Sequence, residues 1–198
     1  MTLFENKRKE IEEKKKSYIS KRINKKKKFA YQISKKKPKY ILKSTNDLKY
    51  IKELVTELEN GEQIHLMSSA FDSPSIIYAL DKLKGIKELI ASTWAVTDRG
   101  LQVVGDLSKK TKIFLLLDKT YSYKWVFASG AIDYLGNINL KFTGNHSKII
   151  LIKTNNAECY TFAGSMNLSN NPRIENITIT KDKEIFDFYE GEIKREFD

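Results

Sequence analysis

The spacing of apolar residues over residues 44–135 predicts helices that alternate with strands. Ser44 or Thr45 caps a helix whose apolar side chains recur at helical spacing as far as Leu58, and Asn60-Gly61 ends it. Strands are expected at 63–70, 86–94 and 112–117. A second helix begins at Ser73-Pro74, and two further helices span residues 97–107 and 121–135. Such alternation is typical of an α/β domain with a mixed, mainly parallel sheet flanked by helices.

The pattern changes in the last third of the chain. Short strand candidates at residues 138–142, 146–152, 159–163 and 175–180 are joined by turns rich in Gly and Asn. A closing helix is expected over residues 183–197, because Ile185, Phe186, Tyr189 and Ile193 fall on one helical face.

The first 43 residues form a separate region. Residues 5–28 favour a helix by propensity, but Phe4, Ile11 and Tyr18 give only a thin apolar stripe. Two interpretations stay open: an arm that lies on nucleic acid or packs on a partner, and a solvated, partly frayed extension. The Lys-Lys-Lys-Pro cluster at 35–38 is the expected hinge. The predicted organisation is therefore a basic helical arm or linker at 1–43 and an α/β domain at 44–198.

The charge of the chain is concentrated in this arm. The 198 residues include 36 Lys+Arg and 25 Asp+Glu, for a formal net charge of +11. Residues 1–43 carry 17 basic and 4 acidic side chains, whereas the remainder carries 19 basic and 21 acidic ones. An asymmetry of this kind indicates an interaction tail for a polyanionic partner rather than a property of the fold.

Several classes of protein do not fit the composition. One cysteine cannot form an internal disulfide, and Cys159, His65 and His146 are too few for a usual four-ligand zinc site. No uncharged apolar run approaches the roughly 18–20 residues of a membrane span. The N-terminus lacks the apolar core of a signal peptide, since Lys and Glu interrupt it. We therefore expect a cytoplasmic protein in a reducing compartment, with no membrane span, metal or cofactor.

The residues most suggestive of chemistry lie between His146 and Glu175. His146 and Lys148 are two apart in an expected strand, so both side chains project to one face. The turn at 164–167, with sequence Gly-Ser-Met-Asn, offers a hydroxyl, an amide and backbone N–H groups. That set suits an oxyanion or a phosphate. Glu175 opens the strand that follows.

In these residues the chain resembles the phospholipase D superfamily, whose signature is His-x-Lys followed by a Gly-Ser-x-Asn turn. The match is His146-Ser147-Lys148 and then Gly164-Ser165-Met166-Asn167, with Glu175 near the acidic position of smaller relatives. The family usually has an aspartate seven residues after the histidine, where this chain has Lys153. That aspartate is viewed as structural in the family, so the change points to a divergent or inactive member without removing a reacting group.

The resemblance implies a role for each motif residue. His146 attacks phosphorus to form a phosphohistidine, while Lys148 and Asn167 hold the non-bridging oxygens with help from Ser165. Glu175 hydrogen-bonds one imidazole nitrogen of His146 and so fixes its tautomer. No metal is required.

The implied mechanism needs a second histidine to protonate the leaving oxygen and then activate water. The chain has only His65 and His146, and His65 has no lysine two residues later. We interpret His65 as a histidine at the core edge or a strand end. An active protein would then be a homodimer that brings two copies of His146 together across a twofold axis.

For the remaining candidate residues a structural role is preferred. Cys159 is expected to be a packed strand residue. Trp94, Tyr121, Tyr123 and Trp125 either stack nucleobases near a cleft around His146 or, the preferred interpretation, are core or interface aromatics. The Asp-Arg-Gly sequence at 98–100 is typical of a turn and the start of a helix, and it is given no functional role.

Fold alone leaves the substrate open. The resemblance implies a metal-independent phosphodiesterase that acts as a homodimer. The basic arm and the absence of an apolar anchor favour DNA or RNA as its substrate, so the first hypothesis is a nuclease with the nucleic acid bound by residues 1–43 and the His146 cleft. The alternatives are a catalytically inactive nucleic-acid-binding or assembly protein on the same fold, and a lipid phosphodiesterase.

Overall fold

The computed structural model describes residues 40–44, 55–69, 72–120, 138–170 and 173–198. The chain divides into two units, 1–33 and 34–198, and the description below concerns the second. The predicted arm helix, the helix at 121–135 and most of the helix at 44–58 lie outside the described residues. Residues 55–57 are helical, which agrees with the end of the helix expected at 44–58.

Eight strands form one mixed sheet in the order β1-β2-β8-β7-β6-β3-β4-β5. They are β1 (Tyr40–Ser44), β2 (Glu62–Ser68), β3 (Ile86–Thr93), β4 (Lys112–Asp118), β5 (Ile138–Thr143), β6 (Lys148–Thr154), β7 (Cys159–Gly164) and β8 (Glu175–Lys181). The α/β sheet flanked by helices was predicted correctly, but the expected predominance of parallel pairing was wrong among the described strands. Three pairings are parallel and four are antiparallel, because β6, β7 and β8 pair antiparallel with their neighbours.

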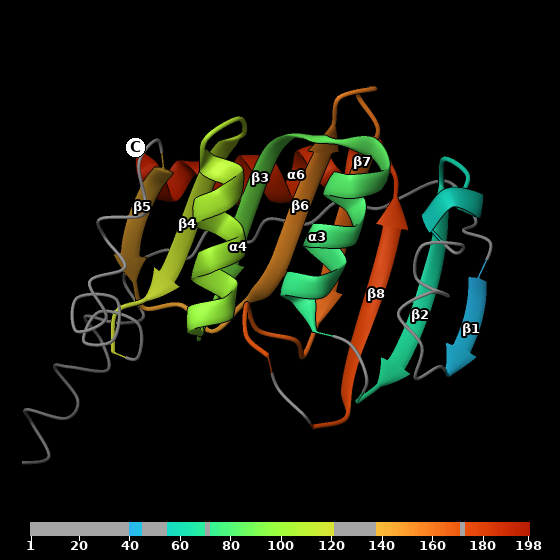
Figure 1. The fold of residues 1–198 in the computed structure, drawn as a ribbon, viewed down its shortest axis with the longest axis horizontal. Coiled ribbons are helices and arrows are strands. Elements are labelled where there is room, and N and C mark those ends of the chain that lie inside the picture. Colours follow the sequence, from blue (N-terminus) through green and yellow to red (C-terminus); the bar gives the residue numbers. More distant parts are fainter. Residues whose placement is uncertain (1–39, 45–54, 70–71, 121–137, 171–172) are drawn as a thin grey trace, which may run out of the picture. The chain divides into compact units, whose positions relative to one another are not determined.

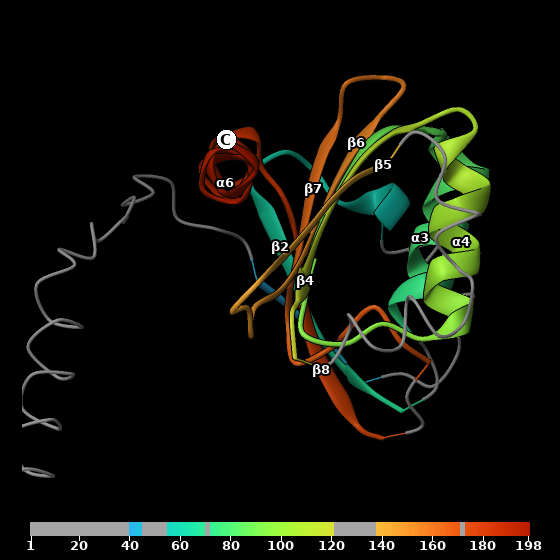
Figure 2. The same ribbon diagram turned by 90° about the vertical axis from the view of Figure 1, so that its left-hand side faces the viewer.

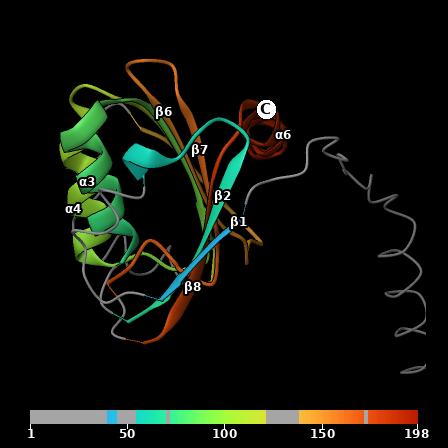
Figure 3. The ribbon, with the colours of Figure 1, turned by 90° about the vertical axis from the view of Figure 1, so that its right-hand side faces the viewer.

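Helices cover both faces of this sheet (Figures 1, 2 and 3). Helices α3 (Ser73–Lys84) and α4 (Asp98–Ser108) lie on one face, and α6 (Lys183–Lys194) with the 3-10 turn η2 (Arg195–Phe197) lies on the other. No helix in the described part of the chain is long and apolar enough to cross a membrane.

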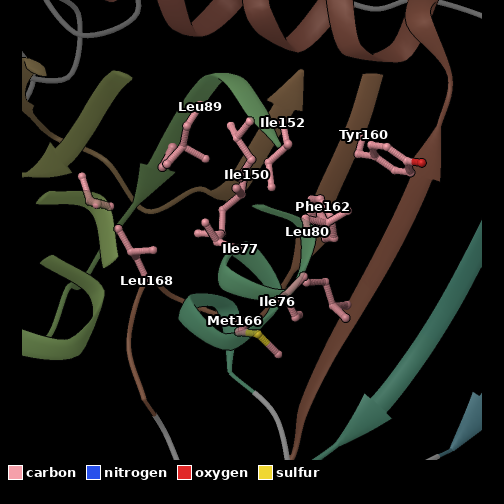
Figure 4. Close-up of a cluster of buried hydrophobic side chains, with 14 of the residues drawn as sticks. Ile76, Ile77, Leu80, Leu89, Ile150, Ile152, Tyr160, Phe162, Met166 and Leu168 are labelled. Atoms are coloured by element: carbon pink, nitrogen blue, oxygen red, sulfur yellow. The ribbon is translucent and has the colours of Figure 1, made fainter. Parts of the chain in front are cut away.

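The larger hydrophobic core fills the space between α3, α4 and the sheet. Figure 4 shows α3 side chains, among them Ile77 and Leu80, against Ile150 of β6 and Phe162 of β7. A smaller cluster lies under α6 and includes Phe186. The alternation of side chains along each strand therefore assigns every strand residue to the α3/α4 face or to the α6 face.

The helices begin where the sequence indicates. Asp72 caps α3 by accepting a hydrogen bond from the Ser75 N–H at 2.8 Å, and Pro74 occupies its first turn. Asp182 caps α6 in the same way through the N–H groups of Glu184 and Ile185.

Two differences from the sequence-based expectation bear on the domain boundary and on the site. Residues 40–44 form β1, which pairs in parallel with β2, so the sheet includes residues that were assigned to the arm. Strand β6 begins at Lys148, so His146 and Ser147 precede the strand in which they were expected.

The strand directions bring many loops to one end of the sheet. Strands β6 and β8 run opposite to the other six, so their N-terminal ends lie beside the carboxyl ends of those six. We call this the site end; it is the lower end of the sheet in Figure 1. The sites of α/β proteins commonly lie outside the carboxyl ends of the strands.

Candidate functional site

The segment that carries His146 is held at the site end by Asn145. Asn145 is 8% exposed, and its side-chain amide donates to the Thr93 carbonyl at 3.2 Å and to the Leu116 carbonyl at 3.1 Å. Its Oδ1 accepts from the N–H of Ser147 at 2.9 Å and from the Ser147 hydroxyl at 2.7 Å. The residues on both sides of His146 are thereby fixed to the ends of β3 and β4.

A buried carboxylate supports the same segment. Asp118, at the end of β4, accepts a hydrogen bond from the backbone N–H of Asn145 at 3.0 Å. The hydroxyls of Ser92 and Ser147 are also hydrogen-bonded to each other. The backbone around His146 is thus defined by contacts with two neighbouring strands.

The His146 side chain itself is exposed and lies beside an aromatic ring. The ring centroids of His146 and Trp94 are 5.6 Å apart, with an interplanar angle of 51°. Lys148 lies opposite Thr93 in the β3–β6 pairing, and its ammonium group donates to the His146 carbonyl at 3.0 Å. The two basic residues of the His-x-Lys motif therefore lie together.

The turn that follows β7 presents Asn167 at the site end. Met166 and Leu168, on either side of Asn167, are buried in the core and anchor the turn (Figure 4). The Asn167 Oδ1 accepts a hydrogen bond from the Ala95 N–H at 3.2 Å. A backbone N–H can only donate, so this atom must be the amide oxygen, and the NH₂ group of Asn167 points the other way.

Ser165 and Glu175 are paired with each other. The Ser165 hydroxyl donates to the Glu175 carboxylate and accepts from the Asn176 N–H at 3.1 Å. The predicted hydrogen bond between Glu175 and His146, and the predicted contact of Ser165 with phosphate, stay predictions. All five predicted site residues nevertheless belong to loops or strand ends at the site end.

Solved structures similar to this one include phospholipase D family members. Nuc from Salmonella typhimurium, a phospholipase D family member, is 17% identical, with a TM-score of 0.44 over 60% of this chain and 82% of Nuc. NucT from Helicobacter pylori is 17% identical, with a TM-score of 0.44 over 68% of this chain and 95% of NucT. TrmBL2, an archaeal chromatin protein with a novel mode of DNA binding, is 15% identical, with a TM-score of 0.48 over 98% of this chain and 64% of TrmBL2. No protein-family model matches the chain, and no curated protein does.

Lys153, where the phospholipase D family usually has an aspartate, lies away from the other motif residues. Along β6, Ile150 and Ile152 point into the core under α3 and α4, whereas Leu151 points toward α6. By the same alternation Lys148 faces the α3/α4 side and Lys153 faces the α6 side. In the β3–β6 register Lys153 lies opposite Glu88, near the far end of the strand, and so is remote from the site end.

The other histidine is also remote from the site residues. His65 lies in the middle of β2, and its Nδ1 is 3.1 Å from the hydroxyl oxygen of Thr178 on β8. Its neighbours Ile64 and Leu66 point into the core under α3, so His65 points to the opposite face of the sheet.

Glu175 shares its face of β8 with Ile177 and Ile179, and so lies on the α3/α4 side.

Cys159 is a packed strand residue, as expected. It is buried in the smaller cluster under α6. Burial raises the pKa of its thiol, although the charge of Lys153 acts in the opposite direction.

Sequence reasoning missed three residues that shape the site: Asn145, Thr93 and Asp118. The position of Asn145 directly before His146 was an available signal, but asparagine in a Gly-Asn turn ordinarily serves the turn itself. Thr93 and Asp118 end apolar strands and carry no local sign of long-range contacts. Among the described residues, no group of three or more His, Cys, Asp or Glu side chains is placed to hold a metal ion.

Proposed function

We propose that the protein is a metal-independent phosphodiesterase that cleaves nucleic acid through a phosphohistidine intermediate. The observation that carries the proposal is the grouping of the two motif halves at one end of the sheet. His146 directly precedes β6 and Lys148 begins it, and Asn167 turns its NH₂ group away from Thr93 and Ala95, which hold its oxygen. The order of these residues is that of the His-x-Lys and Gly-Ser-x-Asn signature.

The proposed reaction consists of two displacements at phosphorus. In the first, an imidazole nitrogen of His146 forms a P–N bond, the P–O bond to the leaving alcohol breaks, and the leaving oxygen takes a proton from a second imidazole. In the second, that imidazole removes a proton from water as the water oxygen attacks phosphorus, and the P–N bond breaks. Lys148 and Asn167 donate to the non-bridging oxygens, whose negative charge they stabilise in both transition states.

The second imidazole would come from a second copy of the chain. His65 is hydrogen-bonded to Thr178 on the face of the sheet opposite to α3 and α4, which makes it a poor candidate for this role. His146 is exposed at the site end, so a twofold axis close to it would bring two copies together. The proposed active form is therefore a homodimer with two His146 side chains in one shared site.

Nucleic acid is the proposed substrate for two reasons. The first 43 residues carry 17 basic side chains against 4 acidic ones. This excess of positive charge would bind a phosphate backbone, and such binding depends steeply on salt. Trp94, beside His146, provides an aromatic surface of the kind on which nucleobases stack.

The test is cleavage of matched DNA and RNA oligonucleotides in excess EDTA by the wild-type protein and by His146→Ala. We expect cleavage to persist in EDTA and to disappear in His146→Ala, because no other group in the proposed mechanism replaces the nucleophile. His65→Ala is the matched control, and it should cleave at the wild-type rate.

Two outcomes would contradict the proposal: cleavage only after Mg²⁺ is added, and cleavage that survives in His146→Ala. Binding of the oligonucleotides with no cleavage by the wild-type protein would instead favour the inactive nucleic-acid-binding alternative.

A further inference from the structure

Thr93 contacts both halves of the candidate site. It is the last residue of β3 and is 1% exposed. Its side chain and its carbonyl group bond to different segments, which are more than 50 residues away along the chain. Packing alone would suit valine at such a buried, β-branched position, so the hydroxyl of Thr93 calls for a polar explanation.

The carbonyl group of Thr93 serves the His146 half. It accepts a hydrogen bond from the Asn145 amide at 3.2 Å. The oxygen of the same amide binds the N–H and hydroxyl of Ser147. Through Asn145, the end of β3 therefore sets the path of the backbone on both sides of His146.

The hydroxyl of Thr93 serves the Asn167 half. Its oxygen accepts from the Leu168 N–H at 3.0 Å. Its proton has two acceptors within reach, the Ala95 carbonyl at 2.8 Å and the Asn167 Oδ1 at 3.2 Å. Together with the Ala95 N–H, the hydroxyl defines where the Asn167 oxygen lies, and so fixes the direction in which the NH₂ group points.

We propose that Thr93 is a positioning residue that acts through Asn167: its hydroxyl fixes the Asn167 amide at the place where a phosphate oxygen bound beside His146 can accept a hydrogen bond. The inference rests on the proposed function, which makes Asn167 a phosphate donor and His146 the nucleophile. Preorganised donors are effective because they need no rearrangement as the transition state forms.

The test begins with Thr93→Val, which preserves the shape of the side chain but removes the hydroxyl. We expect kcat for a small phosphodiester in EDTA to fall on the order of tenfold or more, since small displacements of a catalytic group are costly. Thr93→Ser retains the hydroxyl and should therefore keep kcat close to the wild-type value.

A double-mutant cycle with Asn167→Ala separates positioning from general structure. If Thr93 acts through Asn167, Thr93→Val has little further effect on kcat in the Asn167→Ala background. Effects of the two substitutions that multiply independently would overturn the inference. Thermal unfolding of each variant is followed in parallel, and Thr93→Cys, whose thiol is a weak donor, replaces Thr93→Val if that variant does not fold.

The same cycle on the dissociation constant of inorganic phosphate distinguishes this inference from the proposed function. Coupling in phosphate binding without any hydrolysis would contradict the proposed function and support the role of Thr93. Hydrolysis with independent effects would contradict the role of Thr93 alone. A wild-type protein that binds no phosphate would overturn the inference as well.

Discussion

Trp94 is the residue at the site whose role the sequence left most open. Its neighbours Thr93 and Ala95 are buried, whereas Trp94 is half-buried and lies 5.6 Å from the His146 ring, centroid to centroid. Under the proposed function, Trp94 would contact the group next to a phosphate bound at His146. In a nucleic acid this group is a nucleotide whose base can stack on indole when it is not paired.

We therefore predict that Trp94→Leu raises KM for a single-stranded oligonucleotide about 10-fold, because stacking of one base contributes roughly 1–3 kcal/mol. Trp94→Phe should give a smaller rise. KM for methyl p-nitrophenyl phosphate, which has no base, should change little in both variants. An equal rise for both substrates would show that Trp94 acts only by supporting His146.

At the scale of single residues, the motif predicted candidate side chains but not the contacts that hold their segments in place. His146, Lys148, Ser165, Asn167 and Glu175 lie at one end of the sheet because loops and strand ends meet there. The Asn145 and Thr93 contacts join segments that are distant in sequence, and hydrogen bonds of this kind leave no local periodicity.

At the scale of elements, the first turn of α4 lies unusually close to the Asn167 turn. The Thr97 N–H donates to the Leu168 carbonyl at 3.2 Å, and a Cβ added to Gly100 would lie 2.3 Å from the same oxygen. Only glycine permits this approach. Helix α4 and the Asn167 turn therefore need Gly100 in order to pack as they do.

Gly100→Ala is accordingly predicted to destabilise the fold by about 1–3 kcal/mol, as overpacking does, and to lower phosphodiester turnover by displacing the turn. Gly191→Ala in α6 is the matched control, since nothing lies within 4 Å of its added Cβ. The control should be neutral or more stable by about 0.5–1 kcal/mol, because alanine favours a helix interior. Denaturant unfolding measures both variants, and equal stabilities would contradict the packing argument.

The element boundaries show where local pattern is insufficient. Strand β1 was missed because residues 40–44 directly follow a lysine-rich cluster and depend on β2 for their hydrogen bonds. Strand β6 starts two residues later than expected, because Asn145 and Ser147 bond to neighbouring strands through their side chains. The direction of strand pairing likewise depends on the order of strands in the sheet, which periodicity does not specify.

At the scale of the whole molecule, a basic N-terminal region contrasts with a nearly neutral remainder. Under the proposed function, the basic region binds nucleic acid and the remainder carries the catalytic site. Residues 1–33 alone carry 12 basic and 4 acidic side chains. Because β1 belongs to the sheet, removal of residues 1–33 tests this region without removing β1.

The truncated protein is expected to bind nucleic acid more weakly and with a shallower dependence of log Kd on log salt. For duplex DNA the slope should decrease by about 0.9 for every phosphate that residues 1–33 neutralise in the full chain. Turnover of methyl p-nitrophenyl phosphate should equal that of the full chain. Binding measured between low and moderate salt checks the slope, and an unchanged slope would exclude residues 1–33 as the segment that binds nucleic acid.

The most direct test of a shared histidine site is phosphodiester hydrolysis in EDTA by wild-type and His146→Ala chains mixed through co-refolding. Each active site needs His146 from both copies, so mixed pairs should not turn over. Activity should then follow the square of the wild-type fraction, or about one quarter of full activity in an equal mixture, given random pairing. Activity proportional to the wild-type fraction, or retained by His146→Ala alone, would contradict the account.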